Sequence, residues 1–396
     1  MWSNWSKNVK IDTHVARPTS IEELSVLATK SKIGLVARGH SFNEQIYGEN
    51  LDMLVDLSNL GSGLSLECDR SEVSVGPSTT LRELALETSK LGFQLNNYPS
   101  RLDFSVVGSI VTGSHGSGQN SCLSSMVTAF TLMEYGSGSI TEYKKDHTGF
   151  HNNLILSSRI GIVTSLTLQV SKSISYCRLT FGGLDYIYIP DLIQILTSRK
   201  SLFSVYLNLR DSQRNSLIVT AAASDIEELS LCIKQNFPNV FIGTVKSRGL
   251  QVKQDIESRE FGFAHELIPH SSSELPQFGE ELQSEYFFMI NDFETLYFSL
   301  LHQFPEGLLS LVRSIEIRYI EKSDCLFSPS FDSDVFAFHF TWRNDPKAVA
   351  SGLIALESLL LRSIKSRGGF MRVHWGKLFS GSIRRWFETF ETEGIL

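Results

Sequence analysis

The sequence predicts an α+β fold with two domains, and three observations support this prediction. The chain has 396 residues, of which 42% are hydrophobic, and this is more than one hydrophobic core usually organises. Its first third alternates helical and strand patterns, whereas from about residue 174 longer strands dominate, with a few long helices. No low-complexity segment separates the two parts. We therefore expect two packed domains that share a cleft, over 1–173 and 174–368, and then a short C-terminal return over 369–396.

Helix start signals mark the first domain. Ser20-x-x-Glu23 is a capping-box pattern, and apolar residues follow it at helical spacing. Thr80-x-x-Glu83 begins a second helix, which ends at Gly92. One side of that helix is expected to carry Leu81, Leu84, Ala85 and Leu91. Strands are expected over 33–37, 53–56, 73–75 and 162–170, since apolar residues alternate or cluster there.

Strand alternation marks the second domain. Side chains of two kinds alternate over 203–209, 314–319 and 338–342, which predicts three strands with two distinct faces. Asp345-Pro346 is an N-cap followed by a favoured first helical residue, and it begins a helix that runs to residue 367. His374-Trp375-Gly376-Lys377 then ends a last strand.

Composition narrows the class of partner. The net charge is −7 and no run of Lys or Arg occurs, so the electrostatic signature of a nucleic-acid or anionic-membrane partner is missing. The five cysteines form no CxxC pair and no zinc-type spacing, and we expect no metal and a reducing compartment. Neither a signal peptide nor an apolar run of about 18 residues is present. The sequence predicts a soluble, cytoplasmic, monomeric protein that acts on a small molecule.

Two glycine-rich segments are candidates for binding a cofactor. Arg38-Gly39-His40-Ser41-Phe42-Asn43 follows a strand, and fits either a phosphate-binding turn or an ordinary turn with a polar histidine. The segment 108–118 is rich in small residues, and two such segments favour a dinucleotide. Neither is a Walker A loop or a strand-GxGxxG-helix fingerprint. The first half-resembles a GxSxG nucleophile elbow, but Asn43 stands in place of the second glycine, so a hydrolase is a weaker alternative.

A carboxylate and a guanidinium share one face of a predicted strand. Glu316 and Arg318 are two residues apart and project together, while Ile315 and Ile317 face the other side. The pair fits either a binding site or an ordinary solvated or paired strand face.

A series of short segments, in a fixed order along the chain, resembles one family. They are Asn4-Trp5, Gly39-His40-Ser41-Phe42-Asn43-Glu44, Ser105-Val106-Val107-Gly108-Ser109, Thr112-Gly113-Ser114-His115-Gly116-Ser117-Gly118, Gly161-Ile162-Val163-Thr164, Glu281-Leu282-Gln283-Ser284-Glu285-Tyr286, Glu316-Ile317-Arg318, His339-Phe340-Thr341-Trp342 and His374-Trp375-Gly376-Lys377. Together they resemble the vanillyl-alcohol-oxidase type of flavoprotein, in particular its alditol (xylitol) oxidase branch, and next the sugar-lactone oxidases. The resemblance implies a PCMH-type FAD-binding domain followed by a mixed α/β cap domain that binds the substrate.

The resemblance also implies site residues. His40 is the expected covalent anchor of FAD through the flavin 8α-methyl group. The other residues expected at FAD are Arg38, Gly39, Ser41, Phe42, Ser109, Thr112, Gly113, His115, Gly116, Ser117, Gly161, Ile162 and Val163. Those expected at a polyol are Ser100, Glu316, Arg318, Thr341 and Lys377.

The implied reaction is oxidation of a terminal hydroxyl of a polyol to the aldehyde, with O2 reduced to hydrogen peroxide. A base near the hydroxyl and a cation that stabilises the developing alkoxide both lower the barrier, and Lys377 and Arg318 suit these catalytic roles. An aldonolactone oxidase or dehydrogenase is the alternative enzyme. Ala37 and Pro99 depart from the residues common in relatives, and 393–396 replaces the family's usual closing segment. A truncated flavin-binding protein with little activity is therefore the alternative of another class.

Overall fold

The computed structural model describes residues 1–380 except 31, 49, 148, 151–153, 155–156, 247–250, 256–257, 269–278, 280, 326–327 and 366–367. The departure expected at 393–396 lies outside the described residues. Helices and strands mix throughout both halves, which confirms the α+β class.

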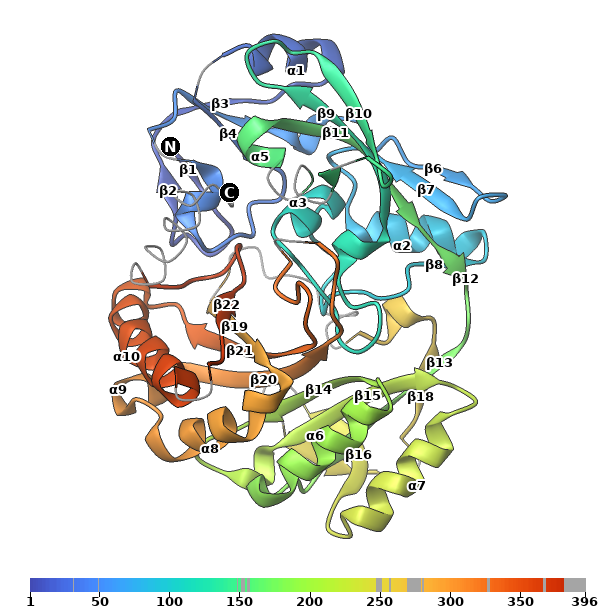
Figure 1. Cartoon of the computed structure of the whole chain (residues 1–396), viewed down its shortest axis with the longest axis vertical. Coiled ribbons are helices and arrows are strands. Elements are labelled where there is room, and N and C mark those ends of the chain that lie inside the picture. Colours follow the sequence, from blue (N-terminus) through green and yellow to red (C-terminus); the bar gives the residue numbers. More distant parts are fainter. Residues whose placement is uncertain are drawn as a thin grey trace.

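The first half holds a three-stranded parallel sheet, in the order β3-β5-β4, and a five-stranded antiparallel sheet, in the order β10-β9-β11-β7-β6. Helix α2 packs on the second of these sheets and helix α1 lies at the far end of this half (Figure 1). Its elements are β1 (Trp2–Ser3), β2 (Lys10–Ile11), β3 (His14–Ala16), α1 (Ile21–Ala28), β4 (Ile33–Val36), β5 (Met53–Asp56), β6 (Ser65–Glu67), β7 (Glu72–Val75), α2 (Leu81–Lys90), β8 (Phe93–Gln94), α3 (Val106–Val111), β9 (Val127–Glu134), β10 (Ile140–Lys144), α5 (Ser157–Ile160), β11 (Gly161–Gln169) and β12 (Ser171–Lys172).

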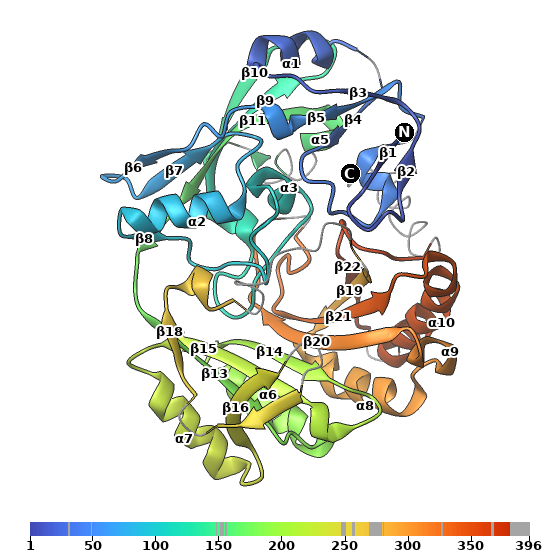
Figure 2. The same cartoon turned by 180° about the vertical axis from the view of Figure 1, so that it is seen from behind.

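The second half is built on a ten-stranded sheet, whose order is β17-β16-β13-β15-β14-β20-β21-β19-β22, with β18 paired to β13. Helices α6, α7, α8 and α10 lie on the side of this sheet that faces away from the first half, as both views show (Figures 1 and 2). Its elements are β13 (Tyr176–Gly182), α6 (Ile189–Ser198), β14 (Leu202–Leu207), β15 (Ser216–Ala222), α7 (Ile226–Asn236), β16 (Phe241–Lys246), β17 (Gln251–Gln254), β18 (Glu260–Gly262), β19 (Glu281–Met289), α8 (Phe293–Gln303), α9 (Glu306–Leu309), β20 (Val312–Ile320), β21 (Val335–Arg343), α10 (Pro346–Lys365) and β22 (Met371–Val373).

The helix starts are explained by their caps. At α2 the Thr80 side chain accepts a hydrogen bond from the backbone N–H of Glu83, and the Glu83 carboxylate accepts one from the Thr80 N–H, so the predicted capping box is confirmed. At α1 only half of the predicted box forms, because the carboxylate of Glu23 accepts from the N–H of Thr19 instead. The prediction that Leu91 belongs to the same side of this helix is wrong: α2 ends at Lys90, and Leu91 is 58% exposed, whereas Leu81, Leu84 and Ala85 are buried.

The alternation in β20 and β21 separates core from site. Ile315 and Ile317 point into the main hydrophobic core together with the helices, as do Phe338 and Phe340. The opposite face of the sheet therefore turns toward the first half, and it carries the polar side chains described below. Strand β22 also pairs with β19, so the C-terminal return begins as part of this sheet.

Two further expectations concern cysteines and membranes. All five cysteines are among the described residues, and no disulfide joins any of them. Within the described part of the chain, no helix combines the length and the apolar character needed to cross a membrane.

Candidate functional site

A cavity of about 850 Å³ is lined by residues from both halves of the molecule. This volume lies in the range of sites that hold a cofactor or a drug-sized ligand. One wall comes from the turn after β4, from 99–115 and from 157–163, and the opposite wall comes from the ten-stranded sheet and from 374–377. The shared cleft expected between two domains is thus present, while the domain limits themselves stay a prediction.

The turn after β4 is held by backbone contacts. Gly39 has φ of +61°, and a Cβ there would lie 3.0 Å from the Trp2 ring. The carbonyl of Gly39 accepts from the N–H of Trp5 at 2.7 Å, and that of Ser41 accepts from the side chain of Asn4 at 2.9 Å. The N–H of Phe42 donates to the carbonyl of Gly376 at 2.7 Å, which ties the two walls together.

His40 faces the cavity from this turn. Both ring nitrogens are buried and have no hydrogen-bond partner among the described residues. The rings of Phe104 and Trp5 lie 4.9 and 5.8 Å from its ring. Burial lowers the pKa of His40 to about 4, although Asp103 opposes this. The imidazole is therefore neutral at pH 7 and has a lone pair available for a bond.

The second glycine-rich segment begins inside a helix rather than a loop. Ser105 caps α3, and its side chain accepts from the N–H of Gly108 at 3.2 Å. Ser109 lies on the cavity wall, and its buried hydroxyl has no partner among the described residues. Thr112 also lines the cavity, but its hydroxyl already donates to the carbonyl of Gly108 at 2.8 Å.

Most residues expected at FAD line the cavity. They are Arg38, Gly39, His40, Ser41, Phe42, Ser109, Thr112, His115, Gly161 and Val163. The orphaned nitrogens of His40 and the orphaned hydroxyl of Ser109 fit a large polar ligand at this wall. The roles of these residues stay predictions.

Four residues expected at FAD are not on the wall. Gly113 packs toward Pro329, and Gly116 lies against Asn97, where a Cβ would approach the Asn97 side-chain oxygen within 1.9 Å. The Ser117 hydroxyl bonds to the backbone of Phe203 in β14, and the Ile162 side chain is fully buried in an apolar cluster. The side chains of Ser117 and Ile162 thus pack away from the cavity, and the roles of these four residues at FAD stay predictions.

The residues expected at a polyol come together on the cavity wall: Ser100, Glu316, Arg318, Thr341 and Lys377. Glu316 lies opposite Tyr206 of β14 and opposite His339 of β21, and His339 lies opposite Glu285 of β19. Neighbouring strands are about 4.8 Å apart, so these four side chains form one row across the sheet. The Tyr206 hydroxyl donates to Glu316 at 3.2 Å.

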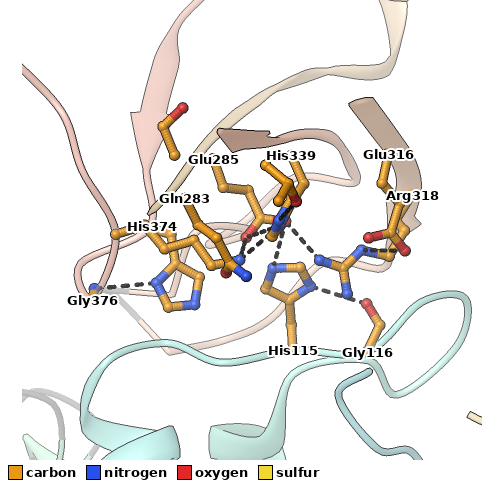
Figure 3. Close-up of polar contacts among 12 residues, drawn as sticks. His115, Gly116, Gln283, Glu285, Glu316, Arg318, His339, His374 and Gly376 are labelled. Carbon is orange, nitrogen blue, oxygen red and sulfur yellow. Dashed lines mark hydrogen bonds and ion pairs between the residues drawn. The ribbon is translucent and has the colours of Figure 1, made fainter. Parts of the chain in front are cut away.

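Glu285 is the residue that the sequence analysis missed. Its side chain is fully buried, and Oε1 accepts from Arg318 Nη2 at 2.7 Å while Oε2 accepts from Lys377 Nζ at 2.5 Å. His115 Nε2 approaches it at 3.4 Å from the first half, and Figure 3 shows this ring pointing up at the carboxylate. One signal in the sequence could have found it: Arg318 and Lys377 were both predicted at one site, and two buried cations need an anion beside them.

The charges of this group depend on one another. Burial opposes ionisation of Glu285, but Lys377 and Arg318 outweigh it and hold its pKa well below the ordinary value. Burial, together with Arg318, lowers the pKa of Lys377, although Glu285 opposes this change. Burial likewise lowers the pKa of His115 and of His339. Lys377 Nζ also contacts Nδ1 of His339 at 2.8 Å.

His115, Glu285 and His374 bring their ligand-type atoms within 4.8 Å of one another. Such a triad has the composition of a metal site, but the carboxylate already pairs with two cations. We therefore interpret the triad as part of the ionic cluster.

Comparison with known proteins agrees with this arrangement. Residues 13–144 match the family described as FAD binding domain. An alditol oxidase of Streptomyces sp. is 27% identical over 396 residues, which cover 96% of this chain and 90% of that protein. The chain is an FAD-dependent oxidoreductase.

Two sugar-lactone oxidases are also similar to this flavoprotein. The L-gulonolactone oxidase of Mus musculus is 25% identical over 177 residues, or 42% of this chain and 40% of that protein. The D-arabinono-1,4-lactone oxidase of Yarrowia lipolytica is 28% identical over 165 residues, or 39% of this chain and 31% of that protein. The resemblance predicted from the short segments is thereby confirmed.

Proposed function

We propose that this flavoprotein oxidises the terminal hydroxyl of a polyol, an alditol such as xylitol or sorbitol, to the aldehyde. The alcohol carbon gives a hydride to FAD and its hydroxyl gives up a proton. O2 then takes up the electrons, so that one polyol and one O2 yield one aldehyde and one H2O2. The similarity to alditol oxidase extends over nearly the whole chain and supports this choice.

The observation that carries the proposal is the group of polar side chains on the second-half wall of the cavity. Glu316, Arg318, Thr341 and Lys377 all face one cavity, across from the neutral ring of His40. Several fixed donors and acceptors suit a substrate with several hydroxyls, and a site of this kind rejects substrates that lack them. Ser100, Glu316 and Thr341 are the groups we assign to these hydroxyls.

Lys377 and Arg318 are assigned to the reacting hydroxyl. A base must lose its own proton before it can accept one, and the lowered pKa of Lys377 favours that form. Arg318 keeps its charge, because burial is outweighed by Glu316 and Glu285, which raise its pKa. Lys377 is therefore the proposed base, and Arg318 the fixed cation that stabilises the alkoxide.

We further propose that His40 holds FAD covalently through the 8α-methyl group. Its neutral ring with unpartnered nitrogens supports this role, since the bond needs a ring nitrogen that acts as a nucleophile. The cavity-lining residues of the first half would surround the cofactor.

Oxidation of an aldonolactone is the second candidate, because lactone oxidases match part of the chain. Peroxide release from purified protein, measured with xylitol, sorbitol, an aldonolactone and no substrate, separates the candidates. We expect the highest kcat/KM with an alditol. A preference for the lactone would replace the polyol assignment, and no turnover with any of them would indicate a flavin-binding protein without activity.

A further inference from the structure

Glu285 is a buried carboxylate that lies behind the cavity wall rather than on it. Its side chain has no exposed area, and the residues that line the cavity include Arg318, Lys377 and His115 but not Glu285 itself. Glu285 therefore reaches the cavity only through the side chains that it binds. Figure 3 shows it between His115, His339 and Arg318, with Glu316 on the far side of Arg318.

We propose that Glu285 is a positioning residue for the oxidation: it holds Arg318 and Lys377 side by side at the reacting hydroxyl and sets the pH at which Lys377 accepts a proton. This inference rests on the proposed function, in which those two cations act on the same oxygen. No role for Glu285 follows from its place in the sequence alone.

The geometry supports a shared counter-ion. Each oxygen of Glu285 serves one cation, Arg318 at 2.7 Å and Lys377 at 2.5 Å. The side chains of Arg318 and Lys377 are largely buried, so their like charges repel each other with little hydration to screen them. An anion between them offsets both effects. It also fixes both side chains, since charge-assisted hydrogen bonds are short and directional.

The neighbouring groups do not replace this anion. Glu316 pairs with Arg318 from the other side, with 3.6 Å between Nε and Oε1. His339 contacts Lys377 through Nδ1 and Thr341 through Nε2, so its ring is a neutral bridge. His115 Nδ1 donates to the carbonyl of Gly116, and His374 Nδ1 accepts from the N–H of Gly376.

The direction of the pH effect follows from these contacts. Lys377 is active as a base only when it is neutral, so the rate should rise with pH through its pKa. The charge of Glu285 raises that pKa against the effects of burial and of Arg318. Removing the charge leaves burial and Arg318, which lower the pKa of Lys377, opposed by the smaller raising effect of Glu316. The pH limb of Glu285→Gln should therefore move to lower pH, although the same change loosens the site.

The test uses the holoenzyme with two readouts. One is anaerobic flavin reduction by xylitol as a function of pH. The other is acetylation of Lys377 by acetic anhydride as a function of pH, located by mass spectrometry, which needs no substrate. In Glu285→Gln both midpoints should fall by at least about one pH unit, the scale of one adjacent opposite charge. The plateau rate of flavin reduction should fall at least about tenfold, because the two cations lose their common anchor.

Two variants make the test specific. Glu285→Asp keeps the charge but withdraws it by one methylene, so its midpoint should lie between those of the parent and Glu285→Gln. Glu357→Gln is the matched control, since Glu357 is also a buried carboxylate, but it bonds to Tyr286 and Ser380 away from the cavity. Its labelling midpoint should equal that of the parent.

The outcomes are distinct. An unchanged midpoint in Glu285→Gln overturns the inference, whatever happens to the rate. If that variant does not fold, a Glu285→Asp midpoint at or above the parent value overturns it as well. A shifted labelling midpoint in a protein whose parent oxidises no polyol supports the placement of Lys377 by Glu285 and overturns the polyol function.

Discussion

The two walls of the cavity carry different kinds of residues. The first-half wall presents turns and small residues, with Gly39 in a left-handed conformation and Ser109 with an orphaned hydroxyl. The sheet wall presents long ionisable side chains, including Glu316 and Arg318 from β20 and Lys377 from the turn after β22. The first wall thus allows a ligand to approach the backbone closely, and the second wall presents charged side chains to it.

This contrast matches two tasks. A large cofactor is held by many weak contacts that need a close backbone approach, for which glycine and serine suit. Chemistry on a hydroxyl needs a few groups whose positions do not drift, and strands hold side chains more rigidly than loops. The first wall also carries ionisable side chains, among them Arg38, His40 and His115, and burial keeps the pKa of each histidine below its usual value.

The largest expected effect tests the first wall. In His40→Ala the flavin should leave completely on denaturation, whereas the denatured parent should keep yellow flavin fluorescence on a gel. The reason is that a covalent bond survives unfolding and an alanine cannot form it. His14→Ala, at an exposed position in β3, is the control and should keep the fluorescence. Loss of flavin from the denatured parent would remove His40 from its proposed role.

The next effect tests the charges of the second wall. Arg318→Ala should slow anaerobic flavin reduction by xylitol at least about a hundredfold, the scale of losing one electrostatic contact to a transition state. Stopped-flow absorbance measures this rate, and flavin content should be unchanged. Arg343→Ala, at the exposed end of β21, should retain the parent rate. A parent-like rate in Arg318→Ala would assign the Glu316 and Arg318 pair to structure alone.

A smaller effect concerns the packing of the first half behind the cavity wall. Gly116→Ala should destabilise the fold by about 1–3 kcal/mol, as overpacking does in a dense interior. The added Cβ would meet the side-chain oxygen of Asn97 at 1.9 Å and the carbonyl of Tyr98 at 2.5 Å. Thermal unfolding measures the loss. Gly61→Ala is the control, because nothing lies within 4 Å of its added Cβ, and equal stability losses in both variants would refute the packing explanation.

The smallest effect tests the row across the sheet. Tyr206→Phe removes one hydrogen bond to Glu316 but leaves the carboxylate in place. KM for xylitol should rise about threefold to tenfold with little change in kcat, the scale of a single hydrogen bond. Steady-state kinetics separates the two constants. A fall in kcat without a change in KM would place Tyr206 in the chemical step instead.

The sequence predicted the sheet wall better than the contacts behind it. Alternation in β20 put Glu316 and Arg318 on one face, because a strand's side-chain period is two and needs no tertiary information. Glu285 was missed because its partners come from 115, 318, 339 and 377, which only the fold brings together. Likewise, Gly116 and Ser117 match a flavin motif in sequence, yet Gly116 lies against Asn97 and the Ser117 hydroxyl bonds to β14. A motif gives residue types, whereas the direction of each side chain depends on the packing around it.

The path of the chain after α10 matters for anyone who exchanges parts between related flavoproteins. Strand β22 belongs to the large sheet, and Lys377 follows it directly, four residues after Val373. A graft of residues 174–368 would carry Glu285 but not Lys377. The imported carboxylate would then have to pair with a side chain of the host. A transplant that extends through 380 carries β19, β22, the anion and the lysine as one unit. The host then has to supply the contacts of the first half, among them the amide of Phe42, which donates to the carbonyl of Gly376, and the ring of His115 beside Glu285.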